Sequence, residues 1–247
     1  MDKGLVQRIG AVRAAMADDI RIGNLATGQM SQIMSSAFGG SDAAGAWDWR
    51  QAYDVMQAAA IDVLAGKAAG QSREAMLRAA QDIAARLPTE TRRSERQMQL
   101  QQFSTAPPWA VVAAAAGAPR EIDVILEPSA GTGSLLRVAL MGARKMRGKA
   151  VPAIHANEID PFRAAILSAT LDRASLTGHD AEFIDDLLAA DVAPTLVLMN
   201  PPFASSAARS DDASIALRHA ISAAKRLAPG GRLVAILPPA ASPERQP

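Results

Sequence analysis

The stretch EIDVILEPSAGTGSLLRVAL, residues 121–140, joins a short apolar run to a helical pattern through a turn that contains glycines. Similar apolar runs recur at PAIHANE (152–158), AEFID (181–185), TLVLMN (195–200) and GRLVAIL (231–237). Helical patterns stand between them, at residues 133–147, 161–175 and about 212–228. Strands that alternate with helices form parallel sheets with helices on both faces. Residues 101–247 are therefore expected to form an α/β domain.

The first hundred residues carry helical periodicity throughout. Apolar side chains recur at steps of three and four residues in the segments 5–20, 49–63 and 76–87, which places them on one face of each helix. The segment SSAFGGSDAAGAWDWR (35–50) is rich in Gly, Ser and Ala and is expected to be a loop, with Trp47 and Trp49 as core anchors. We therefore expect a small helical domain over residues 1–100.

Composition narrows the class of protein. Apolar residues make up 49% of the chain and aromatic residues only 4%, which suits alanine-rich helices on a sheet better than an all-β fold. The formal net charge of +1 leaves any nucleic acid binding to local patches. The absence of Cys excludes disulfides, Cys-based metal sites and thiolate catalysis.

The sequence offers no candidate for a membrane segment. No window approaches the roughly 18–20 apolar residues of a membrane span, and the N-terminal stretch has acidic residues and no continuous apolar core. We expect a cytoplasmic protein without membrane association, and we assign no metal ligands.

The turn Ser129-Ala130-Gly131-Thr132-Gly133 stands between the first strand and its helix. Glycines there permit a tight turn and the close approach of a ligand to the backbone. A dinucleotide-binding fingerprint would have its third glycine where this chain has Leu136, which counts against a nicotinamide cofactor. The turn is either a ligand site or a simple connection.

The second strand ends in Asn157-Glu158-Ile159-Asp160-Pro161. An acidic side chain at the tip of this strand is placed to accept hydrogen bonds from ribose hydroxyls, and Ile159 could cover an adenine ring. Asp160 or Asn157 could also cap the helix that begins at Pro161. Both interpretations can hold, because Glu158 is not needed for the cap.

The fourth strand ends in Asn200-Pro201-Pro202-Phe203. Together with FSTAPPWA (103–110), EPSAGTG (127–133), NEIDP (157–161) and IDD (184–186), this stretch resembles S-adenosylmethionine-dependent amino-methyltransferases. The order and spacing are most similar to adenine-N6 DNA methyltransferases whose cofactor motifs come first. The resemblance covers roughly residues 100–237 and implies a Rossmann-like, class I methyltransferase sheet.

The resemblance implies direct methyl transfer to the N6 amine of an adenine flipped out of double-stranded DNA. The Asn200 side-chain oxygen and the Pro201 carbonyl would each accept one N–H, which aims the lone pair and stabilises the developing positive charge. Pro201 and Pro202 would stiffen the turn, and Phe203 would stack on the target ring. Methylation at carbon 5 of a pyrimidine normally needs a Cys nucleophile, which the chain lacks.

The same resemblance assigns the methionine end of the cofactor. Thr105 would contact the methionine carboxylate, with Phe103 and Ser104 nearby. The remaining contacts would come from Glu127 and from the backbone of the glycine turn, at Ser129, Ala130, Gly131 and Gly133.

At the nucleoside end, Glu158 would bind the ribose and Ile159 would cover one face of the adenine. Asp186, or its neighbour Asp185, would bind the adenine amine. His155, His179 and His219 match no motif and are expected to be structural or surface residues.

Only PPAASPERQP follows the last predicted strand. A complete sheet of this type adds two more strands, and these DNA enzymes usually carry a target-recognition domain, so we expect the methyltransferase portion to be incomplete at its C-terminus. The segments GSDAAGAWDWRQAYD (40–54) and QQFSTAPPWA (101–110) also resemble phage and plasmid methyltransferase–helicase proteins of the anti-restriction kind. That likeness implies a missing recognition or helicase portion.

Three functions stay open at this point. The first is adenine-N6 methylation of DNA, which we expect for the parent protein. The second is the same chemistry on RNA or on a protein glutamine, because enzymes with these acceptors share the NPPF motif. The third is a non-catalytic fragment that binds the cofactor or a partner.

Overall fold

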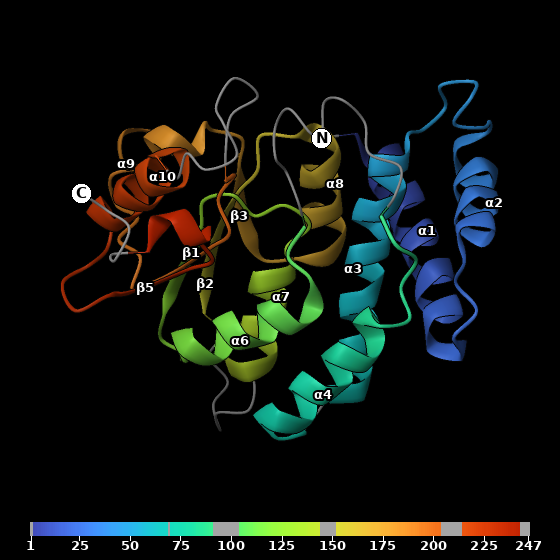
Figure 1. Ribbon diagram of the computed structural model, residues 1–247. Helices are drawn as coiled ribbons and strands as arrows, with labels where there is room; N and C mark the ends of the chain where they lie inside the picture. Colours follow the sequence, from blue (N-terminus) through green and yellow to red (C-terminus); the bar gives the residue numbers. More distant parts are fainter. Residues whose placement is uncertain (1, 69, 91–103, 144–151, 204–213, 243–247) are drawn as a thin grey trace.

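The computed structural model describes residues 2–68, 70–90, 104–143, 152–203 and 214–242 (Figure 1). Its centre is a five-stranded sheet in the order β3-β2-β1-β4-β5, and every neighbouring pair is parallel. The strands are β1 (Val124–Glu127), β2 (Ala153–Asn157), β3 (Ala174–Thr177), β4 (Leu196–Met199) and β5 (Arg232–Ala235). The α/β class and the Rossmann-like parallel sheet are confirmed.

The two faces of the sheet bury alternate residues of each strand, as the two-residue period of a strand requires. Ile125 and Leu198 belong to the larger core, together with side chains of α6 (Pro107–Gly117), α7 (Ser134–Ala143) and α8 (Pro161–Thr170). Leu126 and Met199 belong to the smaller core, with side chains of α9 (Ile184–Leu187) and α10 (Ser214–Lys225). Helices therefore cover both faces, with α9 and α10 on one side of the sheet (Figure 1).

The N-terminal helices form a further layer beyond α7 and α8 (Figure 1). They are α1 (Lys3–Ile22), α2 (Thr27–Phe38), α3 (Trp49–Ala68) and α4 (Arg73–Ala84). Their buried side chains belong to the same hydrophobic core as Ile125 of β1, so the core is continuous from this layer to the sheet. Trp47 is buried in that core and Trp49 packs against it. The predicted domain boundary near residue 100 lies outside the described residues and stays a prediction.

Two sequence predictions of secondary structure are wrong. Residues 35–38, expected in a loop, are the last turn of α2, which buries Met30 and Met34 and ends at Gly39 with a positive φ. The third strand is not AEFID but Ala174–Thr177, whose single large apolar residue gives little strand signal. Residues Ala181–Phe183 form instead a 3-10 helix, η1, which Asp180 caps by accepting the Glu182 backbone N–H (3.0 Å).

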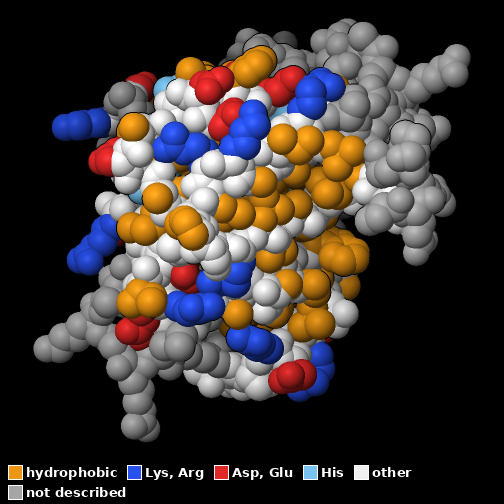
Figure 2. Space-filling model, turned by 90° about the vertical axis from the view of Figure 1, so that its left-hand side faces the viewer, with side chains coloured by type: hydrophobic (Ala, Val, Ile, Leu, Met, Phe, Trp, Pro, Cys, Tyr) orange, Lys and Arg blue, Asp and Glu red, His pale blue; other side chains and the backbone are white. Residues whose placement is uncertain are grey.

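Hydrophobic side chains form a band on the face that holds the β5 edge of the sheet (Figure 2). Trp109 and Val112 of α6 and Ile221 of α10 are among the exposed large hydrophobic residues, at 63%, 46% and 58% of their full exposure. Within the described part of the chain, β5 pairs only with β4. This edge of the sheet therefore lies in an apolar surface.

Candidate active site

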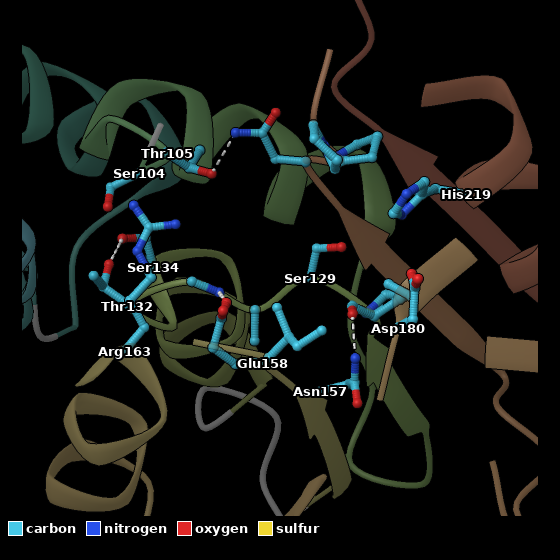
Figure 3. Close-up of a pocket in the computed structure, with 18 of the residues that line it drawn as sticks. Ser104, Thr105, Ser129, Thr132, Ser134, Asn157, Glu158, Arg163, Asp180 and His219 are labelled. Carbon is cyan, nitrogen blue, oxygen red and sulfur yellow. Dashed lines mark hydrogen bonds between the residues drawn. The ribbon is translucent and has the colours of Figure 1, made fainter. Parts of the chain in front are cut away.

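A cavity of about 230 Å³ lies at the carboxyl ends of the strands, where the strand order reverses between β1 and β4. Parallel α/β sheets bind ligands at this position. Figure 3 shows Ser104, Thr105 and Arg163 at one end of the cavity, Asp180 and His219 at the other, and Glu158 between them. The two ends of the cavity therefore differ in chemistry: one end has hydroxyls and a guanidinium, and the other has a carboxylate and an imidazole.

Most of the residues predicted for the site line this one cavity. The predicted residues that line it are Ser104, Thr105, Ser129, Ala130, Gly131, Glu158, Ile159, Asn200, Pro201, Pro202 and Phe203. Phe103 lies outside the described residues. The segments after β1, β2 and β4 and the segment before α6 are therefore brought together from separate parts of the sequence.

Asp185 and Asp186, the two residues predicted to bind the adenine amine, do not lie at the cavity. Asp185 accepts hydrogen bonds from Ser222 and Lys225 of α10, and Asp186 is exposed; neither lines the cavity. Asp180, which follows β3, lines the cavity instead. The resemblance had assigned this contact to the IDD segment (184–186), whereas β3 is Ala174–Thr177 and Asp180 follows it.

Glu127 and Gly133 also lie outside the cavity lining. Glu127 is buried, and this burial raises its pKa well above the ordinary value, opposed by the Leu136 backbone N–H. Gly133 faces α8 rather than the cavity. Oε2 of Glu127 is buried without a hydrogen-bond partner in the described part of the chain.

Glu158 ties the turn after β1 to the loop after β2. Its Oε2 accepts from the Gly131 backbone N–H (2.7 Å), and its Oε1 accepts from the Asp160 backbone N–H (2.8 Å). Asp160 caps α8 by accepting from Phe162 and Arg163 (3.0 Å each), so the sequence-based cap is confirmed and leaves Glu158 for the cavity. Burial raises the pKa of Glu158, against the opposing charge of Arg163.

Gly133 provides the first testable prediction. Its φ is +80°, and a Cβ at this position would lie 2.8 Å from Cδ2 of Leu167 in α8. Gly131 also has a positive φ, +56°, but a Cβ there would meet no atom within 4 Å. Both Ala variants incur left-handed strain of about 1–2 kcal/mol, and Gly133→Ala adds an overpacking cost of about 1–3 kcal/mol.

The midpoint of urea unfolding should therefore be highest for the wild type, lower for Gly131→Ala and lowest for Gly133→Ala. Equal midpoints for the two variants would contradict the close packing of this turn on α8.

Asn157 holds the loops after β1 and β3 in place, a role that its motif did not reveal. Its Nδ2 donates to the carbonyls of Pro128 and His179 (2.9 Å each). Its Oδ1 accepts from the Thr177 hydroxyl (2.7 Å) and the His179 N–H (2.8 Å). A fully bonded amide of this kind fixes the walls of the cavity.

Asn200 presents an acceptor to the cavity. Its Nδ2 donates to Oγ1 of Thr105 (3.0 Å), which fixes the orientation of the amide. Its Oδ1 is buried and accepts no hydrogen bond from the described part of the chain. Because an unpaired buried carbonyl oxygen is costly, this atom is suited to a ligand that donates an N–H.

A buried ionic cluster joins α3 to this site. Asp54 accepts from Nε and Nη2 of Arg163 (3.0 and 2.9 Å) and from the Ser104 hydroxyl (3.0 Å). Arg50 pairs with Asp160 at 2.6 Å and with Asp54 at 3.7 Å. This cluster was not predicted from the sequence. The one sign of it in the sequence is a pair of charged residues, four positions apart, in a helix whose other positions are mostly apolar.

The histidines differ from the sequence-based expectation. His179 and His219, expected to be structural or surface residues, both line the cavity. His155 of β2 does not line it. His219 comes from α10, which no cofactor motif includes.

The cavity offers hydrogen-bond acceptors and an accessible stretch of backbone. Carboxylates of Glu158 and Asp180 face the cavity, and open space lies beside Gly131, where the backbone can approach a ligand. No group of three or more potential metal ligands occurs among the described residues.

None of the helices described is both long enough and apolar enough to span a membrane.

Neither a protein-family model nor a curated protein matches the sequence. Solved structures have a similar fold. A Listeria monocytogenes protein assigned to the class I S-adenosylmethionine-dependent methyltransferases matches at 13% identity and a TM-score of 0.49, over 97% of this chain and 75% of that one.

Two subunits of restriction-modification systems match over 92% of this chain. The type I methyltransferase subunit from Streptococcus thermophilus has 18% identity, a TM-score of 0.44 and 55% of its own length covered. The M protein of the type I restriction enzyme EcoKI has 15% identity, a TM-score of 0.41 and 56% covered. The chain thus spans little more than half the length of these two subunits.

Proposed function

We propose that the chain is an S-adenosylmethionine-dependent N-methyltransferase whose acceptor is the N6 amine of adenine in DNA. The observation that carries the proposal is the buried Oδ1 of Asn200, which has no partner in the described part of the chain. Asn200 lines the same cavity as Glu158 and the glycine turn. An amine acceptor and a nucleoside-binding carboxylate thus share one cavity. The motif order supports adenine in DNA as the substrate.

The polar groups that line the cavity are suited to bind the methyl donor. Glu158 would accept from the ribose hydroxyls, Asp180 from the adenine amine, and the backbone of Ser129–Gly131 would meet the methionine end. Ile159, at the mouth of the cavity, would cover the purine. When bound, S-adenosylmethionine supplies an electrophilic methyl group on a sulfonium.

The chain's own contribution is to make an aromatic amine nucleophilic. The lone pair of such an amine is delocalised into its ring. Asn200 Oδ1 and the Pro201 carbonyl would each accept one N–H, which favours a pyramidal nitrogen, aims the lone pair and stabilises the charge that develops. Thr105 keeps the amide oriented through the Asn200 Nδ2 bond. Phe203 would stack on the flipped base.

Calorimetric titration of the chain with S-adenosylmethionine, beside Glu158→Ala, tests the donor site. We expect the wild type to bind and the variant to bind about tenfold or more weakly, as removal of a hydrogen-bonded charged group predicts. Absence of binding by the wild type, or equal binding by the variant, would contradict the proposal.

Transfer of a labelled methyl group to double-stranded DNA, RNA and protein then identifies the acceptor. Methyladenine in DNA is the expected product. Labelling of RNA or of glutamine alone would place the same chemistry on another acceptor, and binding without any transfer would identify a cofactor-binding fragment.

The raised pKa of Glu158 predicts a pH dependence of donor binding. The ionised carboxylate is the better acceptor for ribose hydroxyls, so affinity should fall as the pH falls through a pKa that lies above the usual range for Glu. In Glu158→Gln, affinity should be weaker and should not change over this range. Calorimetry from pH 5 to 8 measures both, and a parallel pH dependence in wild type and variant would assign the titration to another group.

A further inference from the structure

His219 is a buried side chain whose hydrogen-bonding capacity is unused within the described part of the chain. It is 7% exposed and lines the cavity from α10. Its Nδ1 is buried and has no hydrogen-bond partner among the described residues. Buried polar atoms are normally paired, so an imidazole with an unpaired nitrogen that lines the cavity is a candidate to bind a ligand there.

The imidazole stands at one end of the cavity together with Asp180, away from Arg163 and Thr105 (Figure 3). The negative charge of Asp180 opposes the lowering of the His219 pKa that burial causes. An ionised carboxylate only accepts hydrogen bonds, whereas a neutral imidazole carries one N–H donor and one acceptor nitrogen. The pair therefore presents an acceptor beside a donor.

The protonation state of His219 is consistent with this use. Burial lowers the pKa of the imidazole, Asp180 and Glu182 oppose that shift, and Arg218 on the same helix adds to it. The ring is therefore neutral at pH 7. An aminopurine edge offers the complementary pattern, an exocyclic amine that donates beside a ring nitrogen that accepts.

We propose that His219 and Asp180 together read the purine of the methyl donor: Asp180 accepts from the exocyclic amine, and the His219 Nδ1–H donates to the adjacent ring nitrogen. This inference rests on the proposed function, because it assumes that the donor's nucleoside occupies the cavity. The position of Glu158 between the two ends agrees with a ribose at the centre and the purine at the His219 end. His219 would thus determine specificity for adenine.

Binding of S-adenosylhomocysteine and of its 7-deaza and 1-deaza analogues tests this assignment by calorimetry. The wild type should bind one of the two deaza analogues about tenfold more weakly than the parent compound, the size of one lost hydrogen bond with a buried donor left unpaired. His219→Phe keeps an aromatic ring without a donor. It should bind the parent compound about tenfold more weakly and should no longer discriminate between parent and analogue. His219→Asn, which restores an N–H, should recover part of the discrimination.

Glu158→Ala is the matched control, because it should weaken all three ligands and leave their ratios unchanged. If His219→Phe binds the parent compound like the wild type, or keeps the same ratio, the assignment of His219 is wrong while the donor site stands. If the wild type binds none of the three ligands, the proposed function fails and the inference fails with it. Circular dichroism of each variant verifies that the fold is retained.

Discussion

Replacement of Asn200 by Ala is expected to lower the rate of methyl transfer by about 100-fold or more, the effect of removing one preorganised group that stabilises developing charge. The affinity for S-adenosylmethionine should change little, since the assigned donor contacts lie at Glu158, Asp180 and the glycine turn. The physical reason is the buried Oδ1, which has no other partner in the described part of the chain. Single-turnover transfer and calorimetric binding, measured on the same preparation, separate the two effects.

A second variant, Thr105→Val, tests the orientation of the Asn200 amide. It removes the hydroxyl that accepts from Asn200 Nδ2 at 3.0 Å but keeps the shape of the side chain. Loss of orientation alone should slow transfer by about tenfold, less than loss of the amide itself. Transfer that survives in Asn200→Ala would show that another group accepts the amine. A larger loss in Thr105→Val than in Asn200→Ala would assign Thr105 a direct role.

The sheet could be predicted wherever a strand carries a continuous apolar run. β1, β2, β4 and β5 were located from such runs. β3 was misplaced because its sequence has a single large apolar residue, and the more apolar AEFID attracted the assignment. The loop-like composition of residues 35–50 likewise concealed the last turn of α2, which ends at Phe38.

Whether a site residue could be predicted depended in the same way on whether the strand before it was located. Residues that follow a correctly placed strand, such as Glu158 and Asn200, could be named because a strand end determines where the next side chains point. Asp180 could not, because its strand was misplaced. The ionic cluster of Arg50, Asp54 and Arg163 was also out of reach, since it joins residues 109 positions apart, and local periodicity carries no information on such a contact.

This cluster leads to the largest stability effect that we expect. Asp54→Ala removes the carboxylate that Arg163, a residue only 3% exposed, contacts through two nitrogens. Removal of one partner of a buried ion pair typically costs about 3–5 kcal/mol, because the remaining charge stays desolvated. Ser104 loses its acceptor at the same time, so the segment before α6 should loosen as well.

Asp82→Ala, which breaks the exposed ion pair between Asp82 of α4 and Arg86 just after this helix, is the matched control and should cost at most about 1 kcal/mol. Urea unfolding of both variants gives the comparison, and Asp54→Asn tests how much of the effect depends on charge rather than shape. A loss in Asp54→Ala that does not exceed the control would mean that the N-terminal helices merely rest on the sheet. The expected large loss would mean that α3 is a structural part of the proposed methyl-donor site, because Arg50 contacts Asp160 and Asp54 contacts Arg163.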